Sequence, residues 1–252
     1  MMKQQTSWDA RAALNFMLGG AGAGLLGASA LFASRASILL ALLLIAAGLG
    51  AVWLETGRKL RAANVFLNPF TSWMSRESFM AVLVFAFGIP GSVIQEKLLI
   101  SLAALAALVF LWCQARILSA AKGIPAWRAP EVVPLVVSTG LAEGLGLALF
   151  FDASIALLTL FALALAARAL AWRRYFAAVK PAALEGAGRV LLRLGTFAAL
   201  ALACAAYFIP AVAPLAGSAA LAAGWHLKFR LITRAAFRQG LTLSRLPVRG
   251  VR

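Results

Sequence analysis

Residues 36–54 read ASILLALLLIAAGLGAVWL, a stretch of 19 residues without a charged side chain. An α-helix needs about 20 apolar residues to cross the hydrocarbon core of a bilayer. Seven further apolar runs of similar length occur on either side of this stretch. The eight runs are 12–33, 36–54, 77–94, 98–118, 132–151, 153–172, 189–209 and 211–229. The sequence therefore predicts an all-α integral membrane protein with eight transmembrane helices in a single membrane domain, 1–252.

The composition excludes the common classes of soluble protein. Of the 252 residues, 63% are hydrophobic and 13% are charged, against about 45–50% and 25% in ordinary globular domains. A soluble enzyme, a disordered chain and a disulfide scaffold are all excluded on this basis. Eight spans leave roughly 90 residues for loops and tails, which is too few for a separate soluble domain.

Basic residues alternate sharply from one side of the predicted membrane to the other. With eight spans, 22 of the 24 Lys and Arg fall on the side of the N-terminus, and only Arg35 and Lys97 fall on the opposite side. Cytoplasmic loops carry such an excess of Lys and Arg. We therefore expect a multi-pass protein of a bacterial or archaeal inner (cell) membrane, with both termini in the cytoplasm. The net charge of +16 then requires no nucleic acid.

Small residues repeat every four positions in the first and fifth runs, a pattern typical of helices in close contact. The clearest members are Gly20, Gly24, Gly140 and Gly144. A glycine-rich first helix in each half predicts two four-helix units, 12–118 and 132–229, followed by a cytoplasmic tail, 230–252.

Segment 53–78, WLETGRKLRAANVFLNPFTSWMSRES, joins the second run to the third and carries most of the candidate chemistry. Glu55 directly follows one apolar helix, and Glu77 directly precedes the next. Two acids and several arginines at the mouth of a helix bundle can bind and protonate a polar headgroup. The alternative is an interfacial loop whose arginines meet lipid phosphate and whose Glu77 favours a helix N-terminus.

Two further polar residues lie inside apolar runs. Glu143 is near the middle of the fifth run, and Asn15 is near the start of the first. An intramembrane carboxylate is a functional candidate by default, although a hydrogen bond to a neighbouring helix would also explain it. A small membrane transporter with a midplane site around Glu143 is therefore an alternative function, and a scaffold without a site is a third.

The sequence limits the cofactors that this chain can hold alone. His226 is the only histidine, so a b-type haem with two histidine ligands is excluded. Cys113 and Cys204 are the only cysteines and form no CxxC motif, so we expect no iron–sulfur cluster and no metal site.

The stretches ETGRKLRAANVF (55–66) and TSWMSRES (71–78) resemble the membrane-anchor subunits of the dimethyl sulfoxide reductase and polysulfide reductase-type group. The glycine-rich LNFMLGGAGAGLL (14–26) is similar to their first helix. Members of this group usually carry His at the position of Glu55. That departure makes the chain look more like anchors of phenylacetyl-CoA:acceptor oxidoreductases, and anchors of sulfite-oxidising enzymes are another branch that fits.

The resemblance implies a haem-free, quinone-reactive anchor. Its electrons would pass between a docked iron–sulfur subunit and menaquinone or ubiquinone, with molybdopterin and the clusters held only by partner subunits. By motif match, Glu77 corresponds to the acid of the quinone site, and Arg76 and Trp73 to its neighbours. Arg61 matches the arginine of the upstream stretch, and Glu55 would relay protons in place of the histidine.

We expect the quinone site where the first three spans meet beneath segment 53–78. Asn15 and the bare backbone around Gly20 would leave room for the quinone ring against the first span. A catalytic role is not expected for any residue of this chain in the chemistry of the main substrate, which would belong to the molybdopterin subunit.

Overall fold

The computed structural model is a bundle of long helices, and it describes residues 3–4, 8–32, 34–55 and 59–237. The first rod is continuous over Ala10–Phe32 and consists of α1 (Ala10–Leu14), a π-helical turn η1 (Asn15–Gly19) and α2 (Gly20–Phe32). The next helices are α3 (Arg35–Glu55), the 3-10 helix η2 (Lys59–Leu67), α4 (Trp73–Ile94), α5 (Lys97–Ala120) and the short α6 (Pro125–Arg128).

The second half of the chain continues with α7 (Val132–Ala148) and α8 (Ile155–Val179). A further rod follows, made of η3 (Ala182–Leu184), α9 (Glu185–Leu192), the π-helical η4 (Arg193–Ala198) and α10 (Ala199–Ala206). The 3-10 turn η5 (Pro210–Val212) leads into α11 (Ala213–Thr233). Two-residue strands, β1 (Lys3–Gln4) and β2 (Ala236–Phe237), pair antiparallel.

Each of the eight expected apolar runs is helical, and six of the helices are long and apolar enough to cross a membrane. α7 is apolar but has only 17 residues. α11 is not among these six helices. The all-helical class is therefore confirmed, and six candidate spans are found among the described residues, whereas the predicted eight spans are not confirmed. The expected tail, 230–252, lies largely outside the described residues.

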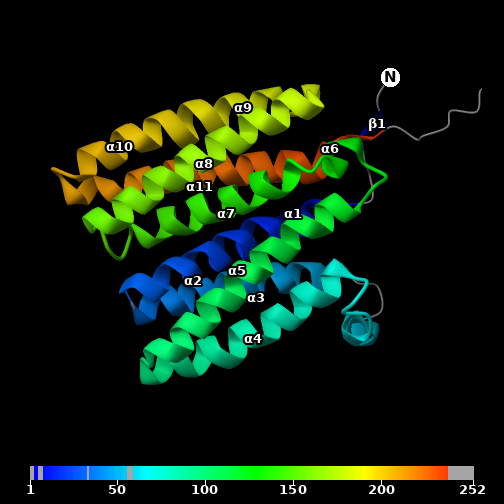
Figure 1. Ribbon diagram of the computed structural model, residues 1–252, viewed down its shortest axis with the longest axis horizontal. Helices are drawn as coiled ribbons and strands as arrows, with labels where there is room; N and C mark the ends of the chain where they lie inside the picture. Colours follow the sequence, from blue (N-terminus) through cyan, green and yellow to red (C-terminus); the bar gives the residue numbers. More distant parts are fainter. Residues whose placement is uncertain (1–2, 5–7, 33, 56–58, 238–252) are drawn as a thin grey trace, which may run out of the picture.

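The central contact of the bundle is between α2 and α7. Figure 1 shows the helices up to α5 on one side and those from α7 onward on the other, with α2 and α7 near the middle. The glycine pattern is the reason for this contact. A Cβ at Gly24 would collide with the Gly140 carbonyl, and one at Gly144 would collide with the Gly24 backbone. The predicted close packing at these glycines is confirmed.

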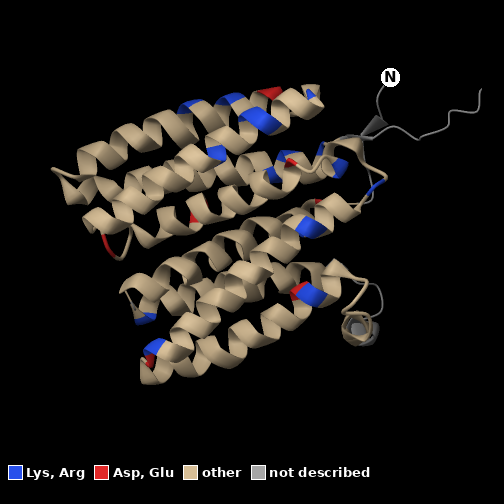
Figure 2. Ribbon diagram, viewed as in Figure 1, with Lys and Arg blue, Asp and Glu red and all other residues tan. Residues whose placement is uncertain are grey.

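Charged residues gather at one end of the helices. Figure 2 shows most Lys and Arg at the end where the N-terminus lies. Arg35 and Lys97 begin α3 and α5, at the opposite end of the rods. We call the strongly charged end the basic end of the bundle.

Candidate functional site

Glu77 is held inside the bundle, one turn along α4. The helix begins earlier than expected, at Trp73, because the side chain of Ser72 accepts a hydrogen bond from the backbone N–H of Ser75 and caps the helix. Glu77 therefore does not sit at the helix N-terminus, and its side chain is only 5% exposed. Asn15 Nδ2 donates to Glu77 Oε1 at 3.3 Å, and the amide of Gln114 also interacts with this carboxyl group.

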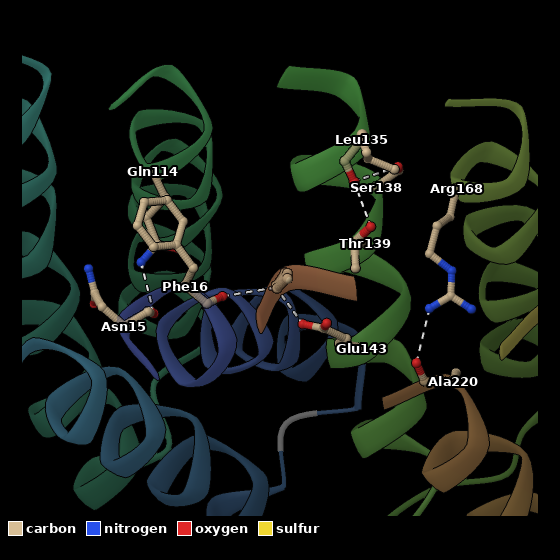
Figure 3. A network of polar contacts seen from close by, with 10 residues as sticks. Asn15, Phe16, Gln114, Leu135, Ser138, Thr139, Glu143, Arg168 and Ala220 are labelled. Carbon is tan, nitrogen blue, oxygen red and sulfur yellow. Dashed lines mark hydrogen bonds and ion pairs between the residues drawn. The ribbon is translucent and has the colours of Figure 1, made fainter. Parts of the chain in front are cut away.

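The π-helical turn η1 explains how Asn15 is positioned. A π-helical turn bonds i to i+5 and often marks a functional site. The carbonyl oxygens at its start are bonded by side chains from distant helices. Gln114 Nε2 on α5 donates to Asn15 O at 3.1 Å, and Lys228 Nζ on α11 donates to Phe16 O at 2.9 Å. Figure 3 shows the side chain of Gln114 reaching toward the Asn15 backbone of this turn.

Two guanidinium groups lie against the ring of Trp73. The Cζ atoms of Arg76 and Arg116 are 4.2 and 4.8 Å from the ring centroid. Arg76 is also committed to the backbone before α4, because it donates to the carbonyls of Pro69 and Phe70 at 2.8 and 2.6 Å. The Nε atom of Arg116 is buried and makes no hydrogen bond with any described residue. Of these two arginines, Arg116 thus has donor capacity left for a ligand.

Half of the buried polar atoms that lack a partner among the described residues belong to η1 and α5, whereas Glu143 Oε1, Arg168 Nε and Trp225 Nε1 lie elsewhere in the bundle. Within the described part of the chain, Asn15 Oδ1, Gln114 Oε1 and Arg116 Nε are buried and make no hydrogen bond. Buried polar groups in folded proteins are nearly always satisfied. Asn15 Oδ1 and Arg116 Nε therefore have capacity to bond a ligand or an ordered water, while Gln114 Oε1 lies near Gly20, 3.5 Å from its Cβ position.

The space around Gly20 is not free. A Cβ built on Gly20 would lie 2.6 Å from Lys228 Nζ and 3.5 Å from Gln114 Oε1. The ammonium group of Lys228 therefore fills the place that we expected the quinone ring to use. Gly20 instead has a packing role, because it lets the Lys228 side chain reach Phe16.

Glu143 forms a buried ion pair. Lys228 Nζ lies 2.5 Å from Glu143 Oε2, and both side chains are almost completely inaccessible to solvent. Arg168 is also fully buried near this pair and donates to the carbonyls of Ala220 and Gly195. Figure 3 shows Glu143 facing the η1 turn, with Arg168 on the other side of α7. One oxygen of the midplane carboxylate, Oε2, therefore has an internal partner, whereas Oε1 is buried and makes no hydrogen bond with any described residue.

Sequence reasoning missed four of these residues. Arg168 and Lys228 were counted with the basic residues of the cytoplasmic surface, but both are buried and contribute nothing to a docking surface. Gln114 and Arg116 were not singled out. The sequence does point to Gln114, because it is an amide side chain inside an apolar run. Burying such a polar group in a membrane costs free energy, as it does for Asn15. The carboxyl of Glu55 and the guanidinium of Arg61 lie outside the part of the chain that the structure describes.

No protein-family model matches the sequence. Over 136 residues, the chain is 34% identical to a subunit of the sulfite dehydrogenase of Allochromatium vinosum. The match covers 46% of this chain and 42% of that relative, so less than half of either protein is aligned. This relative is named as part of a sulfite-oxidising enzyme, one of the branches considered in the sequence analysis. The chain is a multi-helix membrane-type protein similar to a subunit of an oxidoreductase.

Proposed function

We propose that this chain is the quinone-reactive, haem-free membrane subunit of a multi-subunit oxidoreductase. The observation that carries the proposal is the carboxyl group of Glu77, buried at the basic end and bonded to Asn15, whose Oδ1 atom makes no hydrogen bond with any described residue. Similarity to a sulfite dehydrogenase subunit supports oxidation of sulfite by the complex, with electrons flowing toward the quinone.

The residues around Glu77 fit a quinone. A quinone accepts two electrons and takes up two protons on its two carbonyl oxygens. Arg116 donates from Nε to one oxygen, since arginine keeps its own proton and offers five N–H donors. Glu77 delivers a proton to the same region. Asn15 Oδ1 would accept a hydrogen bond from a hydroxyl group of the reduced ring, and the hydrogen bond from Gln114 to the Asn15 carbonyl holds Asn15 in place.

The partner subunits dock on the basic end. The exposed arginines at this end attract an acidic iron–sulfur subunit, which in turn carries a molybdopterin catalytic subunit. Such docking is partly electrostatic, so it weakens as salt screens the exposed charges. The orientation agrees with the predicted cytoplasmic location of both termini.

The test is Glu77→Gln, which keeps the size of the side chain and its hydrogen bond to Asn15 but removes the titrating proton. We expect the subunits to remain assembled while quinone-linked turnover of the purified complex falls by at least about tenfold, as for a lost acid–base group. Glu131→Gln is the matched control, because Glu131 precedes α7 and its side chain caps nothing. Wild-type turnover in Glu77→Gln would refute this site.

If Glu77→Gln retained quinone-linked turnover, Glu143 would be the next residue to test. In that case the transporter alternative requires the Glu143–Lys228 pair to open, and Glu143→Gln would abolish transport. Retained quinone turnover in Glu143→Gln, together with its loss in Glu77→Gln, separates the two functions.

A further inference from the structure

A pocket of about 430 Å³ lies between α8 and α9, away from Glu77. It is formed where the last turns of α8 meet the first turns of the next rod. Its volume is within the range of small-molecule sites in proteins, about 300–1,000 Å³. The lining residues are Trp172, Arg173, Phe176, Ala177, Glu185, Gly188, Arg189 and Leu192.

The floor of the pocket is aromatic and apolar. Trp172 is buried, and its ring centroid is 5.7 Å from that of Phe176. Gly188 makes this floor possible, because a Cβ at that position would collide with the indole ring of Trp172. The close approach of α9 to Trp172 therefore depends on glycine and creates a defined concave surface between two helices.

The rim of the pocket is cationic. Arg173 on α8 and Arg189 on α9 are both exposed and line the pocket from opposite helices. Neither makes an ion pair in the described part of the chain, although the exposed carboxyl group of Glu185 also lines the pocket. Two guanidinium groups facing one space can both donate to a phosphate, which arginine binds through paired N–H groups.

The position in the membrane agrees with a lipid ligand. The pocket lies near the end of α8, a candidate span. The last turns of that helix carry Arg173 and Arg174, and Lys180 follows directly after it. Tryptophan and arginine at such a place mark the level of the lipid headgroups. Along the next rod, Leu194 and Phe197 are exposed apolar side chains that acyl chains would cover.

We propose that this pocket binds the phosphate headgroup of an anionic phospholipid. Arg173 and Arg189 hold the phosphate, the glycerol backbone lies over Trp172 and Phe176, and the acyl chains continue along the apolar face of η4 and α10. Basic pockets between transmembrane helices on the cytoplasmic side bind such lipids in other membrane proteins. The proposal does not depend on quinone binding at Glu77.

The experiment compares lipids retained by the purified full chain in native mass spectrometry, using phosphatidylglycerol and phosphatidylcholine at equal concentrations. We expect phosphatidylglycerol to be retained preferentially, and Arg173→Gln/Arg189→Gln to lose that preference by about 25-fold, since each basic residue near an anionic headgroup contributes roughly fivefold. Arg174→Gln is the matched control, because Arg174 is the exposed neighbour that does not line the pocket.

Two further arms make the result decisive. Glu185→Gln removes the carboxyl group that lines the pocket, so it should raise phosphatidylglycerol retention. Inorganic phosphate should displace the lipid only weakly, because it cannot use the aromatic floor. The proposal is overturned if both lipids are retained equally, if Arg174→Gln has the same effect as the double variant, or if inorganic phosphate competes at concentrations similar to the lipid.

Discussion

Replacing Lys228 by Met should destabilise the whole bundle, because it leaves a carboxylate buried alone. Lys228 Nζ is bonded to Glu143 Oε2 at 2.5 Å and to Phe16 O at 2.9 Å. Both members of the pair have side chains no more than 2% exposed. Solvent therefore cannot replace the lost ammonium group, and the neighbouring cation, Arg168, already donates to two carbonyls.

The magnitude follows from the cost of breaking a buried ion pair on one side, about 3–5 kcal/mol. For a chain of this size, each kcal/mol shifts the midpoint of thermal unfolding by about 2–4 °C, so Lys228→Met should unfold roughly 6–20 °C below the wild type. The double variant Glu143→Gln/Lys228→Met removes both charges. Both variants leave the Phe16 carbonyl without its partner, but the double variant buries a neutral amide at position 143 instead of a carboxylate. An unsatisfied neutral group costs about 1–3 kcal/mol, less than an unpaired charge, so the double variant should be the more stable one.

Cys113 offers a direct assay in detergent. Its thiol is buried in α5, whereas Cys204 is exposed, so a Cys204→Ser background leaves one thiol that a maleimide dye reaches only on unfolding. Lys180→Met, at an exposed position just after α8, controls for the loss of a lysine. A Lys228→Met midpoint within about 2 °C of the control (below the shift that about 1 kcal/mol would produce) would refute the reasoning. So would a double variant less stable than the single one.

The helices were predictable because their signals are local. Apolar runs of nearly 20 residues and glycines repeating every four positions identify each rod and the α2–α7 contact. Helix boundaries depended on caps that a hydropathy pattern does not contain. Because Ser72 caps α4, the helix begins four residues before the expected start. Glu77 therefore lies inside the helix and not at its N-terminus.

The partners of the buried residues were less predictable, because they come from distant parts of the chain. The position of Glu143 inside an apolar run marks it as a costly buried carboxylate. Its partner Lys228 is 85 residues away in the sequence, and the sequence pattern places Lys228 at the surface. A basic residue at the end of an apolar helix usually extends to the interface, so composition alone favours that assignment. The π-helical turn η1 was not foreseen either, since its carbonyls depend on Gln114 and Lys228 rather than on its own sequence.

Two remaining predictions separate packing from function. Gly144→Ala should lower the unfolding midpoint in the Cys113 assay by about 2–12 °C, because overpacking costs about 1–3 kcal/mol. Gly50→Ala should leave the midpoint unchanged, because no atom lies within 4 Å of its Cβ position. Equal midpoints for the two variants would contradict the α2–α7 contact. Arg116→Gln should reduce quinone-linked turnover with little change in the midpoint, because Arg116 holds no backbone carbonyl through its unpartnered Nε. Arg76→Gln should instead lower the midpoint, because it frees the carbonyls of the turn before α4. If both arginine variants lost turnover and stability to the same extent, the assignment of Arg116 to the ligand and Arg76 to the backbone would be wrong.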